Sequence, residues 1–224
     1  MKPSVPLASC QTPSGETLEC IAHDADIYLY LDRQPICSTR AHEPEAALAR
    51  AGCYRVSQYR NPQILLAGIG LGHCLHEVLA IAPPKASISL SEPLKALIEW
   101  NRTLLGEDNK RALQDDRLSL HTKPVGALLK NSTIKFDAIM ISDDPGLTRA
   151  ANNTLRACAA HLNPKGLLCI KASRDDVGRI RGIIRTCNLH TCILPVGARP
   201  GARTRTHAIV CAAARPDFLP ESIG

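Results

Sequence analysis

The chain has 224 residues, of which 45% are hydrophobic and 3% aromatic, and its formal net charge is +6. This length and apolar content suffice for one α/β domain with a small additional unit. So few aromatic side chains argue against a base-stacking surface, and the modest charge disfavours nucleic acid as a partner. No run of 18 apolar residues is present, so we expect no membrane span.

The ten cysteines contain no C-x-x-C pair, and several lie inside apolar, strand-like runs. We interpret most of them as small buried hydrophobic residues, and we expect no metal site. The N-terminus carries no apolar segment typical of a signal peptide. Together these features predict a reduced, cytoplasmic compartment.

The sequence of the N-terminal quarter predicts a small, separate structural unit. Residues 1–14 hold three prolines among polar residues, and we expect them to form a loose tail. Short strand-like segments then predict an antiparallel β-meander over 17–22, 27–31 and 35–39. An alanine-rich helix follows over 45–51, with Pro44 near its first turn. We place a boundary near residue 60, so that 15–60 form this unit, 61–216 the main domain and 217–224 a C-terminal tail.

The strongest functional pattern begins at Ile64. Four apolar residues, 64–67, predict a buried strand, and the glycines that follow predict its tight exit turn. Apolar residues then recur at helical spacing until Pro83. A second strand, 86–90, ends at Ser91 and Glu92, and Glu92 follows Gly68 by 24 residues. A carboxylate in that position is suited to accept both hydroxyl groups of a ribose.

The glycine spacing indicates which nucleoside is bound. A dinucleotide site requires G-x-G-x-x-G, but the third glycine here, Gly72, comes one residue early and His73 occupies the expected position. The pattern Gly68, Gly70, Gly72 followed by Glu92 is that of enzymes that use S-adenosylmethionine. The alternative is a glycine-rich turn that binds no ligand.

Strands and helices alternate over the rest of the chain. Helices are expected near 93–101, 125–129, 150–162 and 173–184, and strands near 118–120, 136–141, 167–171, 191–196 and 208–212. This alternation predicts a doubly wound α/β domain with a mainly parallel, seven-stranded sheet and an antiparallel last strand, preceded by the small meander.

The fourth strand of this domain ends in Ser142-Asp143-Asp144-Pro145. Ligands of such sheets bind at the carboxyl ends of the strands, next to the glycine turn, so Ser142 is expected to line the cofactor site. Asp143 and Asp144 are the candidate catalytic residues, because a carboxylate can hold an amine and take its proton. The alternative is an ordinary turn with an Asp helix cap. His42 and Glu45 either overhang this crevice as a lid or are plain surface residues.

Several segments of the chain, in collinear order over residues 12–215, resemble the bacterial spermidine synthase-like proteins. They are STRAHEPEAALA (38–49), AGIGLG (67–72), Glu92, IEWNR (98–102), LLG (104–106), DDRL (115–118), FDAI (136–139), NPKG (163–166) and HAI (207–209). These proteins belong to the wider class I S-adenosylmethionine-dependent methyltransferase superfamily. The resemblance implies a small N-terminal β domain on a Rossmann-like domain, and often a homodimer.

The resemblance further implies aminopropyl transfer from decarboxylated S-adenosylmethionine to a polyamine such as putrescine. The catalytic Asp of the family falls on Ser142 here, and the acidic residue after the third strand falls on Pro124. Three alternatives therefore stay open: methyl transfer from S-adenosylmethionine itself, a nucleoside-binding or interaction protein without turnover, and, as the weakest, nucleic-acid association through the arginine-rich segment 199–205.

Overall fold

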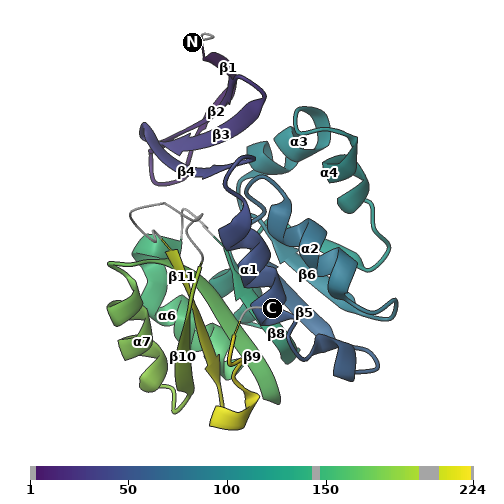
Figure 1. Cartoon of the computed structure of the whole chain (residues 1–224), viewed down its shortest axis with the longest axis vertical. Coiled ribbons are helices and arrows are strands. Elements are labelled where there is room, and N and C mark those ends of the chain that lie inside the picture. Colours follow the sequence, from purple (N-terminus) through teal and green to yellow (C-terminus); the bar gives the residue numbers. More distant parts are fainter. Residues whose placement is uncertain (1–3, 143–146, 197–206, 223–224) are drawn as a thin grey trace.

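The computed structural model describes residues 4–142, 147–196 and 207–222. It contains two sheets of four and seven strands. The small sheet lies at one end of the molecule, beyond the start of the first helix (Figure 1). The expected catalytic residues Asp143 and Asp144 and the segment 199–205 lie outside the described residues. Within the described ranges, no helix is long and apolar enough to cross a membrane.

The N-terminal unit is an antiparallel meander, as predicted, but it has four strands. They are β1 (Val5–Gln11), β2 (Thr17–His23), β3 (Asp26–Leu31) and β4 (Gln34–Ser38), paired in chain order. The expectation of a loose tail over 1–14 was therefore wrong for β1. This edge strand has no fully buried residue, and only the half-buried Ala8 and Cys10 pack against the core, so its apolar alternation is short and weak. Pro6 is typical of a loop, yet it lies at an irregularity of an edge strand, where proline is tolerated.

The seven-stranded sheet has the predicted mixed topology. Its strands are β5 (Gln63–Ala67), β6 (Ser87–Ser91), β7 (Leu118–His121), β8 (Phe136–Ile141), β9 (Leu162–Ser173), β10 (His190–Pro195) and β11 (His207–Ala213). They lie in the order β10-β11-β9-β8-β5-β6-β7. The last strand, β11, runs antiparallel to both of its neighbours, whereas the pairs from β7 to β9 are parallel. The predicted Rossmann-like architecture is confirmed.

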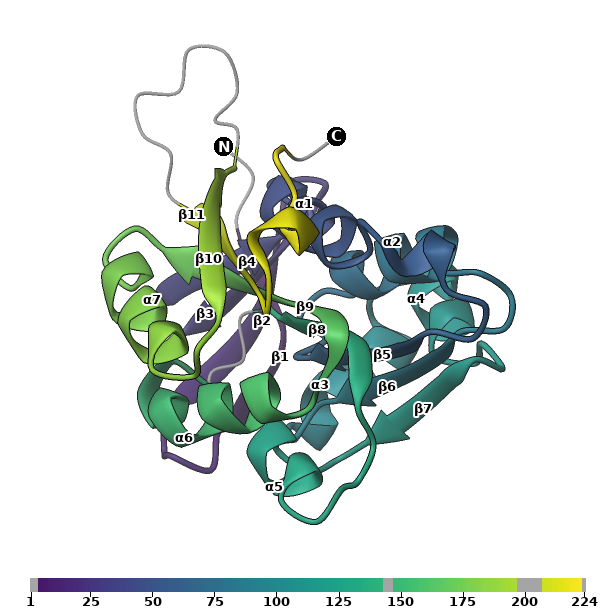
Figure 2. The ribbon, with the colours of Figure 1, turned by 90° about the horizontal axis from the view of Figure 1, so that it is seen from below.

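Helices cover both faces of this sheet. They are α1 (Glu43–Gly52), α2 (His73–Ile81), α3 (Lys95–Thr103), α4 (Glu107–Ala112), α5 (Val125–Leu129), α6 (Leu147–Ala160) and α7 (Val177–Arg185), with short 3₁₀ turns at Val56–Gln58 and Pro216–Phe218. Figure 2 shows α1 and α2 on one side of the sheet and α5 and α6 on the other. The short helix α4, of six residues, was not predicted, because its sequence EDNKRA has no apolar periodicity.

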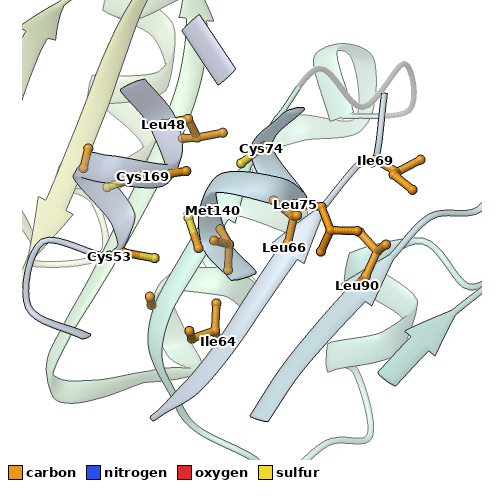
Figure 3. Close-up of a cluster of buried hydrophobic side chains, with 14 of the residues drawn as sticks. Leu48, Cys53, Ile64, Leu66, Ile69, Cys74, Leu75, Leu90, Met140 and Cys169 are labelled. Carbon is orange, nitrogen blue, oxygen red and sulfur yellow. The ribbon is translucent and has the colours of Figure 1, made fainter. Parts of the chain in front are cut away.

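Alternate residues of the central strands fill two separate cores. Leu66, Met140 and Cys169 face α1 and α2, whereas Leu65 and Ile139 face α5, α6 and α7. Figure 3 shows the first core, with Leu48 of α1 and Leu75 of α2 packed over the strands. Three buried residues of the small sheet, Leu18, Cys20 and Leu29, belong to this same core. The meander is therefore fastened to the glycine-turn side of the main domain by apolar packing.

We expect Gly52→Ala to destabilise the protein by about 1–3 kcal/mol, measured as the free energy of unfolding in urea. A Cβ atom at Gly52, the last residue of α1, would overlap Cγ and Sδ of the fully buried Met140. The matched control is Gly182→Ala in α7, where a Cβ would have no neighbour within 4 Å. Alanine at this exposed helical position should raise the free energy of unfolding by about 0.5–1 kcal/mol. Equal effects of the two substitutions would contradict the packing of α1 on β8.

Candidate nucleoside site

The exit turn of β5 has a glycine at every second position from Gly68 to Gly72. Gly68, Gly70 and Gly72 adopt φ values of +87°, +52° and +86°, a region that L-residues with side chains rarely adopt. The N–H of Gly68 donates to the carbonyl oxygen of Ser91 at 2.9 Å, so the turn starts in line with the end of β6. A ligand can approach this turn closely, and α2 begins directly after it.

Glu92 fastens this turn to the end of β6. Its Oε2 accepts the N–H of Ile69 at 3.0 Å, and its Oε1 accepts the N–H of Leu94 at 2.8 Å. The residue is 1% exposed. Glu92 thus sets the shape of the turn and places a carboxyl group beside it.

The order of the strands places this turn at the switch point of the sheet. The chain proceeds from β5 to β6 and β7 on one side, and then to β8 and β9 on the other. Ser142 directly follows β8, is buried, and donates its N–H to the carbonyl oxygen of Ala67 at 3.0 Å. Ligands of doubly wound sheets bind at such a point. The structure therefore brings the predicted residues Gly68, Gly70, Gly72, Glu92 and Ser142 to one edge.

Two buried amides hold the glycine turn from the other side. Asn101 donates from Nδ2 to the carbonyl oxygen of Gly70 at 2.9 Å, and Asn109 donates from Nδ2 to that of Leu71 at 3.0 Å. Asn109 also donates to Oδ1 of Asn101 at 2.7 Å. His76 lies 2.8 Å from Oδ1 of Asn109 and must carry its proton on Nε2 to donate to it. The turn is thereby positioned by α2, α3 and α4 together.

A buried ion pair lies under the neighbouring strand ends. Ile141 of β8 is paired with Ile170 of β9, so Ser142 and Lys171 follow at the same level on the same face. Nζ of Lys171 lies 2.5 Å from Oε1 of Glu45 in α1, with side-chain exposures of 1% and 9%. Glu45 is therefore neither a lid nor a surface residue. Its Oε2 has no hydrogen-bond partner among the described residues.

Glu45 also lines a small, enclosed cavity between the meander and the glycine turn. The cavity measures about 10 Å³ and is lined by Leu29, Ile36, Cys37, Glu45, Gly70, Leu71, His73, Leu97 and Ser142. Among these lining residues Glu45 is the sole carboxylate. A wider, open groove of about 580 Å³ lies between α2 and α4, on the outer side of the turn, and His73 borders both.

His73 is the first residue of α2, and its ring stacks on that of His42 at a centroid distance of 5.0 Å. Burial, with smaller contributions from His42 and His76, lowers the pKa of His73 from its usual 6.5 to about 4. Its Nε2 atom has no hydrogen-bond partner among the described residues. His73 is therefore neutral near pH 7.

The residues that the sequence did not single out are Lys171, Asn101 and Asn109, and for Glu45 it gave only the expectation of a lid or a surface residue. Lys171 follows the apolar run 167–170 of β9, and Glu45 lies on an alanine-rich helix. A charge at the end of a buried strand was the available signal. Asn101 and Asn109 gave none, because exposed amides are ordinary in helices. No group of three or more His, Cys, Asp or Glu side chains suited to a metal ion occurs in the described part of the chain.

We expect Asn101→Ala to lower the free energy of unfolding by about 1–3 kcal/mol, since it leaves buried backbone and amide groups without a partner. The control is Asn153→Ala at an exposed position of α6, which should change stability by no more than about 0.5 kcal/mol. Urea unfolding of the parent, Asn101→Ala and Asn153→Ala measures both changes in the free energy of unfolding. An unchanged Asn101→Ala protein would mean that the amide pair does not hold the turn.

The low pKa of His73 predicts a pH dependence. Between about pH 6.5 and 4 the unfolded chain binds a proton at this residue and the folded chain does not, so stability falls as the pH falls through this window. The variant His73→Gln should lose less stability than the parent between pH 7 and 4.5 in urea unfolding. The exposed His190→Gln control should retain the parent slope. Identical slopes for all three proteins would contradict the burial of His73.

Comparisons with known proteins agree on the fold alone. No protein-family model matches the chain, and no curated protein matches it. Among solved structures, spermidine synthase from Thermotoga maritima is similar with a TM-score of 0.76 and 18% identity, over 96% of this chain and 76% of that one. A spermidine synthase in complex with the transition-state analogue AdoDATO gives a TM-score of 0.75 and 18% identity, over 96% and 75%. The chain thus has the fold of a spermidine synthase, an aminopropyltransferase of the Rossmann-like class.

Proposed function

We propose that the chain binds an S-adenosyl nucleoside at the glycine turn and transfers an aminopropyl group from decarboxylated S-adenosylmethionine to an amine such as putrescine. Within this proposal it is a cytoplasmic enzyme of polyamine synthesis. The observation that carries the proposal is the Glu92 carboxylate, which lies at the end of β6 and accepts the N–H of Ile69 within the glycine turn.

The residues at the switch point fit the nucleoside part of such a donor. Glu92 places a carboxyl group, the group suited to ribose hydroxyls, at the end of β6, and Gly68, Gly70 and Gly72 leave three positions of the turn without a side chain. A Cβ at Gly70 would meet only Sγ of Cys37, at 3.8 Å, within the described residues. When bound, the donor supplies an electrophilic carbon attached to a sulfonium. The chain must then hold the acceptor amine and remove its proton.

A second candidate is a nucleoside-binding protein without turnover. Ser142 favours it, because a hydroxyl at the end of β8 cannot act as a carboxylate base at pH 7. The described cavity beside the turn is mainly apolar, and its carboxylate, Glu45, is already paired with Lys171. Nucleoside binding without aminopropyl transfer would identify this candidate.

Thermal unfolding of the purified chain with S-adenosylmethionine, its decarboxylated form, methylthioadenosine and NAD tests the proposal. A ligand at 100 times its dissociation constant adds about 2.7 kcal/mol, or roughly 5–10 °C for a chain of this size. We expect this shift with decarboxylated S-adenosylmethionine and methylthioadenosine. A preference for S-adenosylmethionine would support methyl transfer instead.

The matched variants are Glu92→Gln and Glu77→Gln. Glu92→Gln keeps the shape of the side chain but removes its charge and one acceptor oxygen. The rise in unfolding temperature on ligand binding should therefore fall to less than half of that of the parent. Glu77 lies in α2 outside the described lining of the site, and its substitution should leave the shift unchanged. A protein that no nucleoside stabilises would refute the proposed binding. Stabilisation followed by transfer to putrescine, detected as methylthioadenosine release, would establish the enzyme.

A further inference from the structure

The modest net charge of the chain is the sum of two unlike parts. Residues 1–146 contain 15 Lys or Arg and 17 Asp or Glu, whereas residues 147–224 contain 12 and 4. The sequences of α6 and α7 include no acidic residue, and neither does that of α5. These three helices contact one another in sequence order along one side of the large sheet (Figure 2). The positive charge of the chain is therefore concentrated on one helical layer.

The cations of the two helical layers differ in their partners. On α1, α3 and α4, four cations pair with carboxylates of their own helix, as Arg50–Glu43, Arg102–Glu99, Lys110–Glu107 and Arg111–Asp108. On α6 and α7, Arg156 and Arg185 are exposed and form no ion pair within the described ranges, whereas Arg179 pairs with Asp176. Arg181 and Arg185 lie four residues apart on one face of α7, where like charges repel each other. We call Arg156, Arg179, Arg181 and Arg185 the basic face.

Two glycines of α7 lie beside these arginines. Gly178 and Gly182 are exposed, and a Cβ atom at either position would have no neighbour within 4 Å. Glycine inside a helix destabilises it relative to alanine, and no packing contact requires glycine here. Both lie three or four residues from Arg181 or Arg185, so they share the same side of the helix. They leave the backbone of α7 open to the close approach of a ligand.

The chemistry of this layer restricts the ligand to one class of polyanion. Guanidinium groups bind phosphates through two parallel hydrogen bonds. A membrane-bound helix also needs an exposed apolar face, but the apolar residues Leu155, Ile180 and Ile184 of α6 and α7 are buried in the core. Single strands and most RNA sites are bound by aromatic stacking, and α5, α6 and α7 contain no aromatic residue. Duplex DNA needs neither feature, because its phosphates line its surface.

We propose that the basic face of α6 and α7 binds the phosphate backbone of duplex DNA without reading its base sequence. The arginines contact phosphates, and Gly178 and Gly182 let the backbone of the DNA approach α7 closely. This binding activity goes beyond the proposed function and does not depend on it. The nucleoside site lies at the carboxyl ends of the strands, whereas the basic face lies on the outer side of the helices.

Fluorescence anisotropy of a labelled duplex of about 20 bp, titrated with the full chain in 50 and 200 mM NaCl, tests the proposal. Non-specific binding of duplex DNA has dissociation constants of about 10⁻⁶–10⁻⁴ M, and four phosphate contacts predict roughly a 100-fold loss of affinity between these salt concentrations. The double variant Arg156→Gln/Arg185→Gln removes two exposed, unpaired charges. It should bind at least 10-fold more weakly in 50 mM NaCl, and its slope of log affinity against log salt should be smaller by about 2.

The matched control is Arg102→Gln/Lys110→Gln, which removes the same charge from exposed positions of α3 and α4. It should bind the duplex within 2-fold of the parent. A third variant, Gly178→Gln/Gly182→Gln, keeps the charge but covers the backbone of α7, and it should bind at least 3-fold more weakly with an unchanged salt slope. Parent-like binding by this glycine variant would contradict the close approach of the DNA to α7.

Three results would overturn the proposal as a whole. The first is a parent protein that does not bind the duplex in 50 mM NaCl. The second is an equal loss of affinity in the basic-face variant and in the control on α3 and α4, because the binding would then reflect net charge alone. The third is tighter binding of a single strand of the same length, or of vesicles of equal parts phosphatidylserine and phosphatidylcholine.

Discussion

The hydrogen bonds of Glu92 are the constraint on which the site depends. One carboxylate joins the glycine turn after β5 to the end of β6, and it does so from a buried position where its partners are backbone N–H groups. Three glycines with positive φ permit a turn of this shape, and the amides of Asn101 and Asn109 hold its carbonyl oxygens from the opposite side. The turn is therefore preorganised, so a ligand need not order it on binding.

The meander completes the environment of this turn. Leu18, Cys20 and Leu29 share a core with Leu66 and Leu75 of the main domain, so the small sheet is packed directly over the glycine-turn side. Its residues Leu29, Ile36 and Cys37 then line the cavity that Glu45 enters from α1. The same apolar packing that stabilises the molecule thus encloses this cavity. A buried acid in an enclosed, apolar space interacts strongly with any donor that enters.

The fold provides a crevice at the strand ends even where the residues that line it differ between proteins. The doubly wound sheet positions a crevice whatever side chains line it, because parallel strands all end at one edge. The fold is that of spermidine synthase at 18% identity, yet the residue that directly follows β8 is Ser142. The carboxylate of Glu45 reaches the same cavity as Ser142 from a different element.

The sequence by itself determined the order and type of nearly all elements, and it predicted that Gly68, Gly70, Gly72 and Glu92 lie together, because these features depend on local spacing. Runs of buried strand residues and glycines in a turn are short-range signals. It missed β1, which has no fully buried residue, and α4, which has no apolar period. Only the tertiary structure decided that Glu45 meets Lys171 and that Asn101 and Asn109 hold the turn. Those contacts join residues distant in sequence, and the side chains themselves are ordinary until packing removes them from water.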